Sequence, residues 1–310
     1  MKLNFSVSIQ NLHILYKILT QLNSLWKSGE QINLFFTEED IVIYPDEKLA
    51  FDQIFGRVHI RPIPDAKTGV AEGFCKNYVV TSQCENNAVL ITPYKFSEFM
   101  DSLKVMVEME AEGEFKLTQR ETTAGIKKYL QTGCRSDSEG EKFNYFIEIE
   151  TIFDPKKYPE NIIPKEISFE VSRGINENFF GKFVDRYNLL NEDSVQIKFC
   201  HLGFEEEKDE KEVLDSKLES DEYQIILQSQ FIQSKLEDAE LMMKLNESEK
   251  KKKSYNVTLT KTIFRKFFSM IKLGGNSKIG VDHEQSIDIL YRIGDYKSIT
   301  AYLEAASCNI

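Results

Sequence analysis

The chain has 310 residues, 41% of them hydrophobic, which is enough apolar content to bury the core of one large domain or two ordinary ones. Fifty acidic residues against 39 Lys and Arg give a formal net charge of −11, a sum that argues against a nucleic-acid partner. No apolar run is long enough to cross a membrane, and the first ten residues alternate instead of forming a signal peptide. We therefore expect a soluble globular protein with no membrane partner.

Residues suited to catalysis or metal binding are scattered along the chain. The five cysteines include no CxxC pair, and no HExxH, GxSxG or GxxxxGK[ST] motif occurs. Cys200 and His201 are neighbours, but adjacent residues on a strand point to opposite faces. The sequence therefore predicts a protein of a reducing compartment that is not an enzyme, with no disulfide framework, no metal site and no cofactor.

Two different periodicities open the chain. Residues 3–9 alternate like a half-buried strand, and residues 10–27 repeat apolar positions every three or four residues, as an amphipathic helix does. We expect five strands after this helix, at residues 32–36, 41–44, 54–60, 78–81 and 89–92.

A second amphipathic helix is expected at residues 93–106, with Pro93 at its start, where a missing N–H does no harm. Further strands are predicted after it, at residues 107–111 with 115–119, 125–131 and 143–150. Three prolines within residues 153–166 then indicate a connector.

The pattern restarts after the connector. Residues 167–172 read as a strand that leads into a helix at 176–190, and a further amphipathic helix is expected at 260–273. Strands are predicted between and after these helices, at residues 195–200, 223–229, 255–259, 278–281, 286–293 and 298–303. The repeated order indicates an internal duplication, although two unrelated α+β domains could share it.

Two charge-dense segments interrupt the second half, at residues 204–222 and 235–254. Their low hydrophobicity and high charge predict long loops or disorder, and much of the net negative charge lies in the first of them. Lys250 to Lys253 could be a nuclear-import patch or a solvated charge run.

Positive charge recurs on the outer faces of the four expected helices. For any single helix, a solvated face explains such residues, and Glu98 and Asp101 interleave with Lys95 and Lys104. Taken together, they suit a lining that contacts phosphates without reading bases. The candidate DNA-binding residues are Lys17, Lys27, Lys104, Lys182, Arg186, Lys261, Arg265, Lys266 and Lys272.

Three segments resemble a known family. The C-terminal SIDILYRIGDYKSITAYLEA, residues 286–305, is similar to the closing strands of DNA sliding clamps. The N-terminal MKLNFSVSIQNLHILYKILTQLNSL and the segment at residues 74–104 look like the Hus-type subunit of the heterotrimeric 9-1-1 checkpoint clamp. The duplicated plan resembles the sliding-clamp superfamily across essentially the whole chain.

This resemblance implies an α+β, DNA-clamp fold with two similar domains, each with two helices on the inner side of antiparallel sheets. The domains would span residues 1–152 and 167–310, and the connector at 153–166 would border a groove for clamp-binding peptides. Three subunits would close a ring around double-stranded DNA. The strands at 125–131 and 195–200 would pair across the subunit interfaces.

The function that follows is a nuclear checkpoint clamp subunit. It would form a hetero-trimeric ring with two other clamp-like subunits, be loaded by an ATP-dependent clamp loader, and bind peptide motifs of repair and signalling proteins. The alternative in the same class is a homotrimeric replicative sliding clamp acting as a polymerase processivity factor. An α+β enzyme and an adaptor that never touches DNA are the alternatives from other classes. The charged inserts depart from a simple clamp, and the few cations on the first-half helices favour a heterotrimer.

Overall fold

The computed structural model describes residues 2–26, 31–45, 54–64, 70–83, 87–123, 125–135, 142–152, 167–190, 192–201, 223–230, 232–237, 242–245, 254–281, 286–293 and 298–308. The chain divides into two compact units. The first unit comprises residues 1–48, 56–161 and 295–302, and the second unit comprises residues 49–55, 162–294 and 303–310. None of the described helices is long and apolar enough to cross a membrane.

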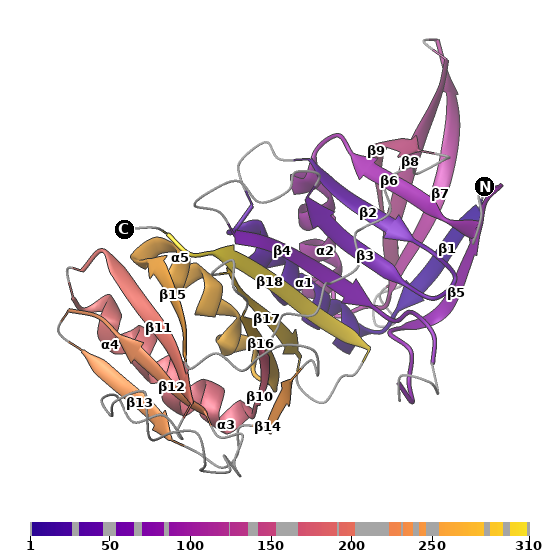
Figure 1. Cartoon of the computed structure of the whole chain (residues 1–310). Coiled ribbons are helices and arrows are strands. Elements are labelled where there is room, and N and C mark those ends of the chain that lie inside the picture. Colours follow the sequence, from indigo (N-terminus) through magenta and orange to yellow (C-terminus); the bar gives the residue numbers. More distant parts are fainter. Residues whose placement is uncertain are drawn as a thin grey trace, which may run out of the picture. The chain divides into compact units, whose positions relative to one another are not determined.

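The first half of the chain forms two helices and a series of antiparallel strands (Figure 1). The helices are α1 (Ile9–Asn23) and α2 (Phe96–Glu108). The strands are β1 (Lys2–Val7), β2 (Ile32–Phe36), β3 (Ile41–Pro45), β4 (Ile54–Ile60), β5 (Cys75–Thr81), β6 (Val89–Pro93), β7 (Gly113–Thr122), β8 (Gly125–Arg135) and β9 (Lys142–Ile152).

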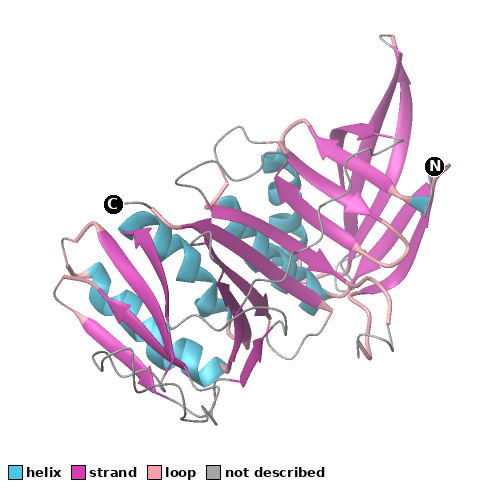
Figure 2. Ribbon diagram, in the orientation of Figure 1, coloured by secondary structure: helices cyan, strands magenta, loops and turns pink. Residues whose placement is uncertain are grey.

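The strands of the first unit pair in the orders β5-β1-β7-β8-β9 and β6-β2-β3-β4. The end of β9 joins the two runs, because Ile149 to Ile152 pair with β6. The helices α1 and α2 pack against each other, and α2 contacts β8 and β9. Figure 2 shows the helices of the unit lying together against its strands.

The second half of the chain repeats the same order of elements. Its first helical segment is continuous and consists of α3 (Arg173–Ile175), a π-helical turn η2 (Asn176–Gly181) and α4 (Lys182–Asn188). Its second is α5 (Lys261–Phe267) with the 3-10 turn η3 (Phe268–Leu273). The strands are β10 (Ile167–Val171), β11 (Ser194–His201), β12 (Tyr223–Gln228), β13 (Gln233–Glu237), β14 (Met242–Leu245), β15 (Ser254–Thr260), β16 (Ser277–Val281), β17 (Ser286–Arg292) and β18 (Ile299–Ala306).

Strand pairing repeats as well as element order. In the second half the orders are β14-β10-β16-β17-β18 and β15-β11-β12-β13, which match the two runs of the first unit position for position. A shared sequence of elements can arise by chance, but a shared pairing order of nine strands requires the same chain path twice. The predicted duplication of architecture is therefore present.

Aromatic side chains fill the core of each unit. In the first unit Phe115, which is 1% exposed, stacks on Phe5 at 4.6 Å between ring centroids and lies 6.4 Å from Phe99. In the second unit Phe264 is fully buried and lies 5.7 Å from Phe183. Each such ring contributes about 1.5–3 kcal/mol by leaving water.

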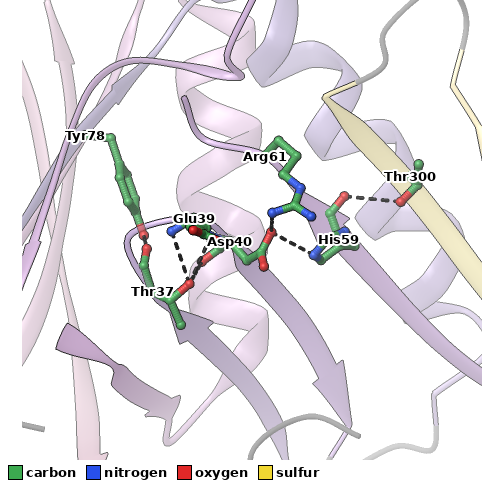
Figure 3. A network of polar contacts seen from close by, with 7 residues as sticks. All are labelled: Thr37, Glu39, Asp40, His59, Arg61, Tyr78 and Thr300. Atoms are coloured by element: carbon green, nitrogen blue, oxygen red, sulfur yellow. Dashed lines mark hydrogen bonds and ion pairs between the residues drawn. The ribbon is translucent and has the colours of Figure 1, made fainter. Parts of the chain in front are cut away.

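A polar network fixes the turn between β2 and β3 in the first unit (Figure 3). The Asp40 Oδ1 atom lies 2.9 Å from His59 Nε2 and 2.6 Å from Arg61 Nη1, both from the region of β4. Tyr78 on β5 donates its hydroxyl to the Thr37 carbonyl at 2.6 Å. Burial raises the pKa of Tyr78 well above its ordinary value, so the phenol stays a neutral donor. These contacts hold the turn against two other strands.

Several predicted boundaries were wrong for identifiable reasons. Pro93 is the last residue of β6 and not the start of a helix, because it pairs with Ile149 at the end of the strand and Lys95 is the helix cap. The strand predicted at 107–111 does not form. The apolar face that includes Leu103 and Met106 carries α2 on to Glu108 instead.

The helix predicted at 10–27 ends at Asn23. The Ser24 hydroxyl donates to the Gln21 carbonyl, a local bond that competes with helix continuation. The helix predicted at 176–190 begins earlier, at Arg173, because Ser172 caps it by accepting from the Ile175 N–H at 3.4 Å.

Part of the second charged insert is ordered as strands, against the prediction of loop or disorder. The strand β13 pairs with β12, and β14 pairs with β10. β13, which contains Leu236, forms a hairpin with the preceding strand β12, and β14, with Met242, Met243 and Leu245, pairs with a strand far away in sequence. The local charge density conceals both short stretches. The connector at 153–166 and the insert at 204–222 lie outside the described residues.

Truncation of a core ring should destabilise the first unit. We expect Phe115→Ala to lower the free energy of unfolding by about 3–5 kcal/mol, because it leaves a cavity beside Phe5. Trp26, the only tryptophan and a buried residue of this unit, reports urea unfolding by its fluorescence. Tyr94→Ala is the control, since that side chain is 67% exposed and should cost less than about 0.5 kcal/mol. Equal losses for both variants would contradict the assigned core.

Candidate nucleic-acid interface

The helix α5 has the strongest positive face in the described part of the chain. Its N-terminus is capped by Thr260, whose hydroxyl accepts from the Ile263 N–H at 3.3 Å. Ile263, Phe264 and Phe267 are buried, and this inward face leaves Arg265 and Lys266 exposed on the other side. The segment from Lys261 to Leu273 contains four cationic residues and no acidic one. Its outward face is therefore electropositive.

The helical segment ending in α4 packs beside α5 and has a weaker positive face. Phe183 and Tyr187 are buried, which leaves Lys182 and Arg186 exposed. Asp185 lies between these two cations and is also exposed. At the start of the segment, Arg173 Nε pairs with Glu177 Oε1 at 2.8 Å.

Contacts between rings hold the two helical segments of the second unit together. Phe180 stacks on Phe268 at 5.0 Å, and Phe264 meets Tyr187 edge to face at 5.7 Å. Because both segments bury aromatic residues in one core, their exposed cations Lys182, Arg186, Arg265 and Lys266 all belong to the opposite, solvated faces.

Lys261 differs from the other candidate residues because it is held within the unit. Its Nζ donates to the Leu190 carbonyl and lies 5.3 Å from the centroid of the Tyr187 ring. Burial, with Glu192 and Asp193 nearby, raises the pKa of Tyr187 to about 12, so this phenol is neutral at physiological pH. The Lys261 cation therefore has an internal role as well as a place on the positive helix.

The described helices of the first unit offer fewer unpaired cations than those of the second unit. On α1, Lys17 is exposed and the helix contains no acidic residue. On α2, Lys104 lies 3.8 Å from Glu108, one turn away. Lys95 at the helix cap pairs with Glu98 at 3.7 Å. The i,i+4 spacing of Lys104 and Glu108 was a readable signal that sequence analysis missed.

The side chains of two candidate DNA-binding residues lie outside the described part of the structure. Lys27 lies outside the described residues, and Lys272 is on η3, where the structure describes the backbone but not this side chain. Within the described residues, no group of three or more His, Cys, Asp or Glu side chains is arranged to hold a metal ion.

The strands predicted to pair with neighbouring subunits are internal, so this prediction was wrong. β8 is paired with β7 over residues 125–133 and with β9 over residues 129–135. β11 is likewise paired with β12 and β15. For β11, sequence alone could not reveal this, because its partner β15 is distant in the chain, whereas β8 pairs with the strands that immediately precede and follow it. Among the described strands, the open edges near these positions belong to β9 before Ile149, to β13 and to β15, part of which is covered by the bond from the Cys308 N–H to the Thr258 carbonyl.

Comparison with known proteins identifies the architecture. No family model matches the chain, and no curated protein sequence matches it. The structure is similar to the crystal structure of proliferating cellular nuclear antigen from Entamoeba histolytica, with a TM-score of 0.56 and 10% sequence identity, over 99% of each chain. The chain has the DNA-clamp fold. The fold class predicted from the sequence is thereby confirmed.

Neutralising Lys261 should affect stability more than neutralising its neighbour. We expect Lys261→Met to lower the free energy of unfolding by about 1–2 kcal/mol, because the Leu190 carbonyl loses a charged donor. Arg265→Met is the matched control on the same helix and should change it by less than about 0.5 kcal/mol, since Arg265 is exposed. Urea unfolding followed by circular dichroism measures both. A larger loss for Arg265→Met would contradict these assignments.

Proposed function

We propose that this chain is a subunit of a ring-shaped DNA checkpoint clamp. It encircles duplex DNA without sequence specificity, has no catalytic activity of its own, and recruits damage-signalling and repair proteins in the nucleus. The observation that supports this most is the duplicated pairing order of strands with two helical segments in each half, in a fold similar over its length to a proliferating cellular nuclear antigen. The segment from Lys261 to Leu273, whose charged residues are all cationic, supports the proposal that the partner is DNA.

Sequence-independent binding follows from the kind of side chains on the helices. Lys and Arg neutralise phosphates, which are the same at every base pair, and such contacts position a protein without reading sequence. Lys182, Arg186, Arg265 and Lys266 are exposed and supply this charge. Ion-mediated contacts exchange readily along the duplex, so the ring slides.

The charge distribution supports a hetero-trimeric ring over the homotrimeric replicative alternative. Lys95 and Lys104 on or beside α2 are both paired with glutamates, so this helix adds little net positive charge to a lining built from helices. Three identical copies would repeat this deficit around the ring. Two other clamp-like subunits with more basic helices would complete a lining that attracts DNA.

Open strand edges supply the means of joining subunits. The first part of β9 and the whole of β13 each have an unpaired side among the described residues. A strand edge with unpaired N–H and C=O groups pairs readily with another strand. We assign these two edges, in place of β8 and β11, to the contacts with neighbouring subunits. An ATP-dependent loader opens the ring, and peptide motifs of client proteins bind it.

Removing charge from α5 should release the assembled ring from circular DNA at lower salt. The change is Arg265→Gln with Lys266→Gln in the complex with its partner subunits. We expect the slope of log retention against log salt to fall by about 0.9 for each phosphate that the variant no longer neutralises. Lys198→Gln with Arg292→Gln, on strands β11 and β17, removes the same charge and should leave retention unchanged.

The proposal is contradicted if the α5 double variant and the strand double variant are retained equally on circular DNA. Assembly is checked by gel filtration of each complex, so that a failure to form the ring is not mistaken for weaker DNA binding.

The purified chain alone should not form a stable trimer. Size-exclusion chromatography with light scattering measures this directly, and we expect the mass of a monomer, 36.0 kDa, or of a weak dimer. A stable homotrimer would contradict the checkpoint assignment and favour the replicative clamp. Co-purification with two different clamp-like proteins is the matching positive result.

A further inference from the structure

One solvated sheet face of the first unit contains exposed cations and aromatic rings that have no role in the proposed clamp function. The strands β5, β1, β7, β8 and β9 lie side by side, and alternation puts every second residue on the same face. On β1 this face is Lys2, Asn4 and Ser6, while Leu3, Phe5 and Val7 point into the core. The β7–β8 hairpin extends beyond the other strands of the unit (Figure 1).

Register places the solvated residues of five strands in transverse rows. One row consists of Val79, Asn4, Lys116, Gln131 and Phe146, each paired with the next. The following row includes Thr118, Tyr129 and Glu148. We call this surface the β1–β7–β9 face. Its charged residues with described side chains are Lys2, Lys116, Arg120, Lys127, Lys142, Glu114, Glu148 and Glu150.

Cations outnumber acids on this face, although the whole chain has a net charge of −11. Lys127 pairs with Glu148 at 2.8 Å, and the hydrogen bond to that carboxylate raises the Lys127 pKa. In the described part of the chain, Lys2, Lys116 and Lys142 are exposed and make no ion pair. An acidic protein that keeps unpaired lysines on one sheet face presents a surface complementary to a polyanion.

Aromatic rings on the same face point to one kind of polyanion. The guanidinium carbon of Arg120 lies 3.7 Å from the centroid of the Phe146 ring and 5.7 Å from that of Tyr129. The two rings meet edge to face at 6.4 Å and are both partly exposed. Bases of single strands stack on aromatic rings and on the planes of arginine side chains. Every nucleotide supplies both a phosphate and a flat base, whereas the charged groups of an acidic peptide are carboxylates without a stacking ring.

We propose that the β1–β7–β9 face binds single-stranded nucleic acid. Tyr129, Phe146 and Arg120 stack on unpaired bases, and Lys116 and Lys142 contact the phosphates. A duplex hides its base faces within its own stack, so it cannot use the rings. The site is separate from the helices that we assign to duplex DNA, and its existence does not depend on a ring.

Fluorescence anisotropy of the purified chain with a labelled oligothymidine of about 16 nucleotides tests this proposal. We expect Tyr129→Leu with Phe146→Leu to weaken binding about tenfold, because stacking is abolished while apolar bulk remains. Lys116→Gln with Lys142→Gln should reduce the salt slope by about 0.7 for each phosphate that is no longer neutralised. Circular dichroism verifies folding, and Arg120→Met tests the same stack if the double ring variant does not fold.

Two comparisons make the result decisive. Lys198→Gln with Arg292→Gln removes the same charge as the lysine pair from the second unit and should leave oligothymidine binding unchanged. Arg265→Gln with Lys266→Gln removes the general attraction of α5 for polyanions and should preserve the tenfold effect of the ring variants. This second comparison separates failure of this site from failure of the clamp proposal.

The proposal is overturned if oligothymidine does not bind or if binding is indifferent to all three stacking side chains. Competition by polyglutamate as effective as that by oligothymidine would reassign the face to an acidic protein partner. A duplex of equal length that binds as tightly, with the same dependence on Tyr129 and Phe146, would also contradict base stacking.

Discussion

The packing of two helical segments against one another within each unit is the interaction on which the rest of the structure depends. In the second unit, Phe180 stacks on Phe268 and Phe183 meets Phe264, so both segments must turn the same kind of face inward. Once these rings are buried, helical periodicity fixes the side of the helix on which the residues between them lie. Arg265 and Lys266 are solvated because Phe264 and Phe267 are not. The aromatic core thus determines the charged surface.

Net charge is a poor guide to what this protein binds. Its sum is −11, yet the segment from Lys261 to Leu273 contains no acid, and the sheet face containing Lys116 and Lys142 has more cations than acids. Pairing matters as much as position, since Glu98 and Glu108 neutralise the cations of α2. The Debye screening length is about 8–10 Å near physiological salt. A ligand at such a local surface therefore interacts with its cations and only weakly with acidic residues farther away.

Sheet edges and sheet faces supply two different kinds of contact in the first unit. The open edge of β9 has backbone groups available to another strand, which suits assembly. The solvated face of the same strand has the ring of Phe146 beneath Arg120, which suits recognition of flat groups. A strand can serve both purposes because its backbone hydrogen bonds lie in the plane of the sheet and its side chains stand across it.

The sequence alone determined the helices, most strands, the duplicated order of elements and which cations are solvated on α4 and α5. These features follow from local periodicity, since a helix bonds residues four apart and an amphipathic stripe is visible within about 11–18 residues. Only the tertiary structure decided that β11 is internal, that the second insert contains β13 and β14, and that Lys261 binds the Leu190 carbonyl. It also decided that Arg120 meets Phe146. The pairs β11 with β15 and β14 with β10, and the contact of Lys261 with Leu190, join residues far apart in the chain. No local pattern predicts which distant segment a strand or side chain will contact.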